Sequence, residues 1–200
     1  MIKLADIVKT FHGSQVLAGV NLHVAGGEIV CITGPSGCGK TTLLEIIAGS
    51  LNPDHGARAV ATERIGYAFQ DDCLVPWLTV EENLLLGVSG WPETSVREGL
   101  EIMGLAEQRM RKPAELSGGM KRRLNVARAL AIKPELLLLD EPFAFQDSAT
   151  IELLQKKILT ANRENGTTVI LVSHDTQNAA PLGGRLVPFA SISGISRSAS

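Results

Sequence analysis

The segment Gly34–Thr41, which reads GPSGCGKT, constrains this chain more than any other stretch. It fits the pattern G-x-x-x-x-G-K-[ST] and lies between an apolar run ending at Thr33 and a segment with helical apolar spacing. A strand, a glycine-rich loop and a helix in this order form a cradle for phosphates, because backbone N–H groups and the positive helix end face the anion. We expect Lys40 to reach the β- and γ-phosphates and Thr41 to bind Mg²⁺. The predicted nucleotide-contacting residues here are Gly34, Pro35, Ser36, Gly37, Cys38, Gly39, Lys40, Thr41 and Thr42.

This loop does not separate kinases, GTPases, motors and transporter ATPases, which share it. The composition adds modest limits. A length of 200 residues and 44% apolar content suit one compact domain, and a formal net charge of −2 gives no general attraction to nucleic acid, which we do not expect as a partner. Three cysteines and an amino terminus without an apolar signal core favour the cytoplasm. The longest apolar run, Leu136–Leu139, is too short to span a bilayer, so a membrane role would be peripheral or through a partner.

Strand-like and helix-like segments alternate along most of the chain. Strands are expected over residues 20–24, 28–33, 64–70, 135–140 and 167–173, and helices over 117–132 and 148–165. This alternation predicts an α/β fold of the P-loop NTPase type, with a mostly parallel sheet covered by helices and an N-terminal antiparallel β part. We expect one domain over residues 1–190. Its β-rich, RecA-like core would comprise residues 1–70 and 114–190, residues 71–113 would form a helical subdomain continuing into helix 117–132, and residues 191–200 would be a disordered tail.

Two acidic residues follow the apolar run LLLL at the expected carboxyl end of a strand, where ligands bind in open α/β sheets. Because neighbouring strand residues point to opposite faces, Asp140 can serve Mg²⁺ while Glu141 faces a water that attacks the γ-phosphate. Two further polar residues end strands. His174 follows a strand that should lie beside the Asp140 strand, which makes a hydrogen bond to the γ-phosphate plausible, and Gln70 could touch Mg²⁺ and the attacking water.

A second phosphate-binding surface is expected at the start of helix 117–132. Ser117 offers a hydroxyl, and Gly118 and Gly119 offer backbone amides at a helix amino terminus. The chain then contains two half-sites. If one monomer cannot bring both to the same nucleotide, two monomers placed head to tail can do so, giving two shared sites in a homodimer.

The motifs together resemble the ATPase subunit of an ABC transporter. They are, in order, Gly34–Thr41, Gln70, LSGGM at 116–120, LLLLDEP at 136–142, Asp147 and SHD at 173–175. The stretches 69–87 and 117–130 are similar to ATPase components of nitrate, sulfonate and taurine importers. The resemblance implies an ATP-hydrolysing, nucleotide-binding subunit that uses ATP and Mg²⁺ to drive import of a small anion or an organosulfur or nitrate-like solute.

The resemblance also implies roles for single residues. Phe11 would stack on adenine, Gln70 would sense the γ-phosphate, Glu141 would polarise the water and His174 would complete the site. Catalysis would combine this positioning with charge neutralisation by Lys40, His174 and Mg²⁺.

Further implications concern partners. Ser117–Gly119 would hold ATP bound by the other subunit's Lys40, and Asp147 would bridge the subunits. A membrane permease would meet the helical subdomain near Val75–Trp77, and a solute-binding protein would act indirectly. The ATPase would then lie on the cytoplasmic face of a prokaryotic cell membrane.

Several alternatives stay open at this stage. Trp77 either lies in an exposed apolar patch for a partner or packs the subdomain's own core. A soluble ABC-type ATPase acting on DNA or ribosomes is a second function, although a basic face is not evident from the sequence. The Lys121–Arg123 triplet fits a solvated face or support for the ATP site. A catalytically inert regulatory subunit is a third function, supported by the unusual residues Phe145 and Gln146 before Asp147.

Overall fold

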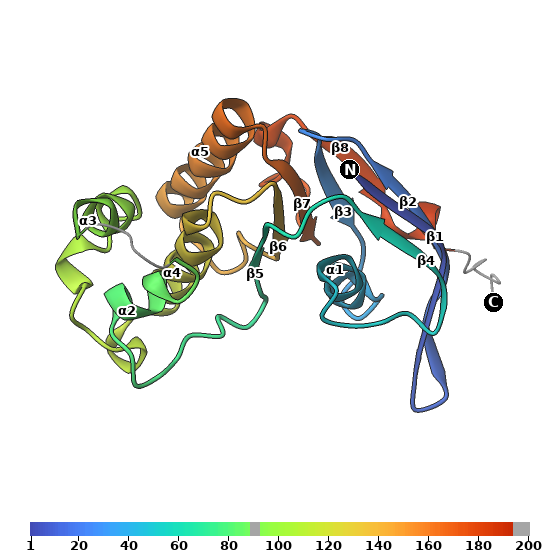
Figure 1. The fold of residues 1–200 in the computed structure, drawn as a ribbon, viewed down its shortest axis with the longest axis horizontal. Coiled ribbons are helices and arrows are strands. Elements are labelled where there is room, and N and C mark those ends of the chain that lie inside the picture. Colours follow the sequence, from blue (N-terminus) through green and yellow to red (C-terminus); the bar gives the residue numbers. More distant parts are fainter. Residues whose placement is uncertain (89–92, 194–200) are drawn as a thin grey trace.

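The computed structural model describes residues 1–88 and 93–193 of the chain (Figure 1). Its main sheet has five strands in the order β5-β6-β7-β3-β8, all parallel to their neighbours. The strands are β3 (Ile29–Thr33), β5 (Ile65–Ala68), β6 (Leu136–Asp140), β7 (Thr168–Ser173) and β8 (Arg185–Pro188). The predicted P-loop NTPase fold class, with its mostly parallel sheet, is confirmed.

A second, antiparallel sheet of three strands has the order β2-β1-β4, as expected for the N-terminal part. It consists of β1 (Ile2–Phe11), β2 (Ser14–Val24) and β4 (His55–Val60). Helix α1 (Lys40–Ala48) lies between the two sheets (Figure 1) and starts at the phosphate loop.

The two faces of the main sheet are buried in different cores. On one face, alternate residues of β3, β6 and β7 pack against α1 and the antiparallel sheet; they include Val30, Ile32, Leu136, Leu138, Ile170 and Val172. On the other face, the residues between them pack against helices α4 (Gly118–Ala131) and α5 (Ser148–Asn165); they include Cys31, Leu137, Leu139, Val169 and Leu171. Burial on both faces explains why these strands are continuously apolar.

Between β5 and β6 the described residues form helices: α2 (Val80–Leu85), α3 (Glu93–Ile102), short 3₁₀ turns at Ala106–Gln108 and Pro113–Glu115, and α4. In Figure 1, α2 and α3 form a lobe on the left, and α4 lies between this lobe and β5. Ser117 is the N-cap of α4, and its hydroxyl accepts a hydrogen bond from the Met120 amide. No helix within residues 1–88 and 93–193 is long and apolar enough to cross a membrane.

Several boundaries differ from the sequence-based expectations. The strand expected over 64–70 ends at Ala68, and β4 and β8 were not expected. Residues 191 and 192 were expected in a disordered tail but lie in α6 (Phe189–Ile192), because Phe189 packs into the core. Ser193 is the C-cap of α6, and the rest of the expected tail, from residue 194, lies outside the described residues.

Candidate functional site

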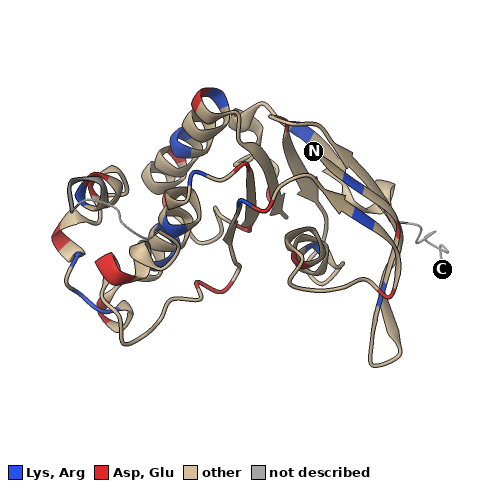
Figure 2. Ribbon diagram, viewed as in Figure 1, with Lys and Arg blue, Asp and Glu red and all other residues tan. Residues whose placement is uncertain are grey.

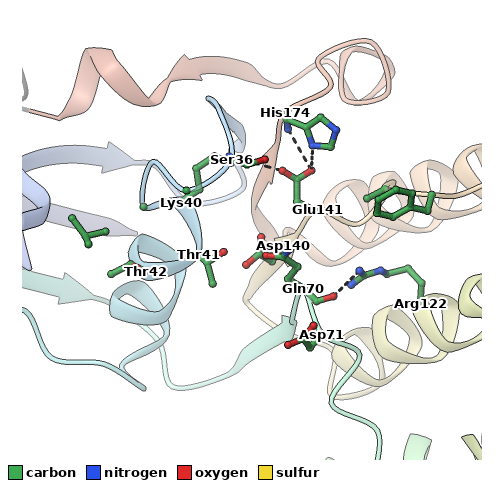
Figure 3. Close-up of a pocket in the computed structure, with 15 residues that line it drawn as sticks. Ser36, Lys40, Thr41, Thr42, Gln70, Asp71, Arg122, Asp140, Glu141 and His174 are labelled. Carbon is green, nitrogen blue, oxygen red and sulfur yellow. Dashed lines mark hydrogen bonds and ion pairs between the residues drawn. The ribbon is translucent and has the colours of Figure 1, made fainter. Parts of the chain in front are cut away.

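A cavity of about 540 Å³ lies at the carboxyl ends of β3, β5, β6 and β7 (Figure 3). These four strands are neighbours in the sheet, so residues far apart in the sequence meet there. The lining residues are Val16, Ser36, Gly37, Gly39, Lys40, Thr41, Thr42, Gln70, Asp71, Arg122, Asp140, Glu141, Ala144, Phe145 and His174. The cavity therefore brings together six predicted loop residues and four other predicted residues, Gln70, Asp140, Glu141 and His174.

The loop conformation depends on glycine at its helix end. Gly39, the N-cap of α1, has φ +106°, a region that other residues rarely adopt. A Cβ at this position would lie 2.9 Å from Leu17 Cδ2 and 3.0 Å from the Val16 carbonyl oxygen. Both the backbone angle and the tight packing against β2 exclude a larger residue.

Lys40 is buried, with 6% of its surface exposed, and points back along the loop. Its ammonium group donates hydrogen bonds to the carbonyls of Gly34 at 2.8 Å and Pro35 at 2.9 Å. These two predicted loop residues thus hold Lys40 rather than line the cavity. Cys38 also does not line it, because its sulfur lies against Gly34. Lys40 is the one cationic side chain of the loop, and it lines the cavity.

Glu141 links the loop to the end of β7. Its Oε2 lies 3.0 Å from His174 Nδ1 and accepts a hydrogen bond from the His174 amide at 3.3 Å. Its Oε1 lies 3.9 Å from Lys40 Nζ. The backbone of Glu141 has φ +49°, which is uncommon for a residue other than glycine and turns the side chain into the cavity. Figure 3 shows Glu141 and His174 side by side opposite Lys40.

Asp140 lies deeper, with 1% of its surface exposed. Burial raises the pKa of its carboxyl group, and a hydrogen bond from the Thr41 side chain partly opposes that effect. Its Oδ2 is buried and has no hydrogen-bond partner among the described residues. An unpaired buried carboxylate oxygen is costly unless a cation or another donor meets it, so this position fits a divalent cation.

Gln70 reaches the cavity from the end of β5, and its neighbour in space is Arg122 of α4 (Figure 3). Arg122 donates from its two terminal nitrogens to the carbonyls of Phe69 at 2.7 Å and Gln70 at 2.6 Å. From the sequence, Arg122 was considered only within the Lys121–Arg123 triplet, for which support of the ATP site was one of two interpretations, and it was not among the predicted site residues. The usable signal was the three-residue spacing of Arg122, Asn125 and Arg128, which puts three polar side chains on one face of a largely apolar helix.

Three other predicted residues or segments lie outside this cavity. Phe11 is at the end of β1, is 39% exposed, and has Lys9 Nζ 5.5 Å from its ring centroid; Val16 lines the cavity on that side instead. Asp147 is the N-cap of α5, where its carboxylate accepts hydrogen bonds from the Thr150 amide and hydroxyl. Ser117, Gly118 and Gly119 start α4 and do not line the cavity. The predicted roles of all three stay predictions.

The comparisons with known proteins agree with this geometry. A family model described as ABC transporter matches residues 17–144. The bicarbonate transport ATP-binding protein CmpD of Synechococcus elongatus is 41% identical over 187 residues, covering 86% of this chain and 67% of that protein. The aliphatic sulfonates import ATP-binding protein SsuB of Pseudomonas entomophila is 42% identical over 189 residues, covering 91% and 70%.

Solved structures are similar as well. A dimeric, post-hydrolysis state of the ATP-binding cassette MJ0796, bound to ADP and Pi, superposes with a TM-score of 0.87 at 32% identity, covering 94% of each chain. A second dimeric structure of MJ0796, described as a bacterial ABC transporter cassette, gives a TM-score of 0.84 at 33% identity and covers 94% of this chain and 95% of that one.

Proposed function

The chain belongs to the ABC transporter family of ATPases, and from this premise we propose that it powers an importer for a small anion or an organosulfur solute. One observation carries the ATPase part: Lys40, Asp140, Glu141 and His174 converge in one cavity at the carboxyl ends of adjacent parallel strands. The solute class is supported by relatives named for bicarbonate and for aliphatic sulfonates.

Mg²⁺ fits the position between α1 and β6. Asp140 and Thr41 would hold it, with Gln70 beside them, because the Asp140 Oδ2 atom lacks a partner among the described residues. When bound, the cation would neutralise charge on the β- and γ-phosphates. The cation would also remove the cost of burying the Asp140 carboxylate.

Hydrolysis would depend on Glu141. Its carboxylate is held by His174 on one side and faces Lys40 on the other, so a water placed between Glu141 and the γ-phosphate would be oriented for attack. Lys40 would leave its loop carbonyls to bind phosphate oxygens, and His174 would donate to the γ-phosphate. Each of these groups stabilises charge or positions a reactant, which is the main catalytic requirement in phosphoryl transfer.

A second copy of the chain would complete each site. Ser117–Gly119 begin a fourteen-residue helix yet lie outside the cavity of their own chain, so they are available to a nucleotide held by another chain. The similar MJ0796 structures are dimers. Phe145 supports the same arrangement, because it is fully exposed at the cavity rim, where an apolar ring would be covered by a partner.

The permease would bind the lobe at Trp77. Trp77 is 71% exposed, so the alternative that it packs the lobe's own core is wrong. The loop that carries it is fixed by the buried Asn83, whose amide group binds the backbones of Val75, Leu78 and Thr79. A rigid loop presenting an exposed aromatic ring suits a protein partner. This contact would hold the ATPase on the cytoplasmic face of the membrane, and a solute-binding protein would act through the permease.

The alternative of a DNA- or ribosome-acting ATPase has less support. Figure 2 shows Lys and Arg interspersed with Asp and Glu over the lobe and both sheets, rather than gathered along one element. Such a mixed surface does not favour a polyanion.

The test is the molecular mass of the Glu141→Gln variant in solution, measured by light scattering with and without Mg²⁺ and ATP. We expect the mass to double only when ATP is present, and Lys40→Ala in the same background to remain monomeric. A monomer that nevertheless binds ATP would contradict the shared-site dimer.

A further inference from the structure

One polar face of α4 binds the backbone of residues 69–73, the segment that leaves β5. Arg122 donates to the carbonyls of Phe69 and Gln70, and Asn125 Nδ2 donates to Phe69 at 2.8 Å. Six residues after Arg122, Arg128 donates to the carbonyls of Cys73 at 2.9 Å and Asp72 at 3.2 Å. Five hydrogen bonds therefore attach this segment to α4.

These bonds explain why β5 ends at Ala68. Beyond that residue the carbonyls of the segment accept hydrogen bonds from α4 side chains instead of from a neighbouring strand. Arg122 and Arg128 each bind two successive carbonyls through a charged fork, and the Arg122 bonds are the shorter, at 2.7 and 2.6 Å against 2.9 and 3.2 Å. Asp72, 3.7 Å from Arg122, adds an opposite charge beside the fork.

The bonded segment connects two functional positions. At one end the Gln70 side chain lines the cavity with Lys40 and Asp140. On the other side, Arg122 lies five residues from Ser117, just over one helical turn. The backbone of Gln70 is thus held by the part of α4 that begins with the second phosphate-binding surface.

The two ends of α4 are held differently. Near its carboxyl end, α4 packs so closely on β5 that a Cβ at Gly66 would overlap the Ala129 carbonyl oxygen. Arg122 lies seven residues before that contact, or about 10 Å along the helix axis. A small tilt about the contact would therefore displace Ser117, Arg122 and the Gln70 backbone together.

We propose that Arg122 is a positioning residue that fixes Gln70 to the amino-terminal half of α4 and thereby couples the two ATP sites of the dimer. In the proposed dimer, Ser117–Gly119 of a chain would contact the ATP of the partner, whereas Gln70 of that chain would contact its own ATP. When the partner's ATP fixes the amino-terminal end of α4, the Arg122 bonds consequently fix the position of Gln70 beside the chain's own ATP. This inference rests on the proposed two-site dimer.

The test combines steady-state ATPase kinetics with a double-mutant cycle. Arg122→Gln is made alone and together with Gln70→Ala, and kcat, the equilibrium Kd for ATP and the Hill coefficient for ATP are measured. We expect Arg122→Gln to lower kcat about tenfold, to leave the Kd within about twofold and to bring the Hill coefficient towards one. In the Gln70→Ala background the same change should have no further effect on kcat, because the residue it acts through is absent.

Arg128→Gln is the matched control, since it removes two carbonyl hydrogen bonds and a 3.3 Å bond to Asn125 Oδ1 on the same helix face but leaves the Arg122 bonds to Phe69 and Gln70 in place. It should lower Tm about as much as Arg122→Gln while changing kcat less than threefold. If Arg122→Gln does not fold, Arg122→Lys keeps the charge and one donor group, and an intermediate kcat is expected.

Two results would overturn the proposal. If the loss of kcat in the double variant equals the product of the losses in Arg122→Gln and Gln70→Ala, Arg122 does not act through Gln70. A Kd for ATP that rises in proportion to the loss of kcat would show direct nucleotide binding by Arg122. Failure of the proposed function looks different, because the unmodified protein would then lack ATPase activity or ATP-dependent pairing.

Discussion

Replacing Glu141 with Gln should separate ATP binding from ATP hydrolysis. The substitution keeps the shape of the side chain and one acceptor oxygen for the His174 amide, but it removes the carboxylate. Loss of a general base typically lowers a rate by about 10²- to 10⁴-fold, which is an increase of roughly 3–5 kcal/mol in the barrier. We therefore expect phosphate release to fall by at least about a hundredfold.

The same change should strengthen ATP binding. The Glu141 carboxylate lies 3.9 Å from Lys40 Nζ, and the two side chains are only 12% and 6% exposed. Unit charges at that distance attract by about 4 kcal/mol at an effective dielectric constant near 20, but desolvation of both groups offsets most of this gain. If the net attraction of Glu141 for Lys40 is about 1 kcal/mol, removing it makes Lys40 available to the phosphates and tightens ATP binding roughly fivefold. Removing a negative charge beside the γ-phosphate acts in the same direction.

Single-turnover phosphate release and displacement of a fluorescent ATP analogue would measure the two effects separately. Lys40→Ala is the control for binding, because it removes the phosphate ligand and leaves Glu141 in place. Turnover of Glu141→Gln within threefold of the unmodified protein would refute the role of Glu141. An unchanged or weaker affinity for ATP would refute the competition between Glu141 and the phosphates for Lys40.

Two further predictions concern the lobe and the pH dependence of folding. Trp77→Ser should leave Tm and basal ATPase activity unchanged, because the ring is 71% exposed. It should reduce sedimentation of the ATPase with membranes that contain its permease. Equal sedimentation of the variant and the unmodified protein would exclude Trp77 from that contact. The Arg185 guanidinium lies 2.6 Å from Glu28 and lowers the pKa of that carboxyl group in the folded protein. The pair therefore stabilises the fold fully above the unfolded pKa of Glu28, about 4.3. This stabilisation is lost as the pH falls through the lower pKa that Glu28 has in the folded protein. Arg185→Gln should thus reduce the free energy of unfolding by less than about 1 kcal/mol at pH 7 and by still less near pH 3. Urea unfolding of the variant and the unmodified protein measures this reduction at each pH. A larger reduction at pH 3 than at pH 7 would contradict the prediction.

Most of the site was predictable because it depends on strand ends. Gln70, Asp140 and His174 each follow an apolar run, and parallel strands bring their carboxyl ends to one edge of the sheet. The helix over 148–165, with its Gly166 cap, was predicted with the boundaries that the structure has. In these cases local sequence and tertiary structure favour the same conformation.

The remainder depends on contacts that the sequence does not specify locally. Strand β4 has mostly exposed or half-buried residues, so it shows little apolar alternation and forms by pairing with β1. The spacing of Arg122, Asn125 and Arg128 indicates a polar helix face, but the contacts of Arg122 with Phe69 and Gln70 depend on how α4 packs against β5. The left-handed backbone of Glu141 is imposed by its surroundings, because glutamate does not favour that conformation.

The position of β3 in the sheet has a consequence for synthesis of the protein on the ribosome. The strand that leads into the phosphate loop pairs with β7 on one side and β8 on the other, and both neighbours come from the last fifth of the chain. About 135 residues separate the end of β3 from the start of β7, which at roughly 5–20 residues per second is on the order of ten seconds of translation. During that interval both edges of β3 lack their partners. A nascent chain therefore cannot gain stability from ATP until β7 and β8 have been synthesised, and chains terminated before β7 would expose β3 to aggregation or proteolysis.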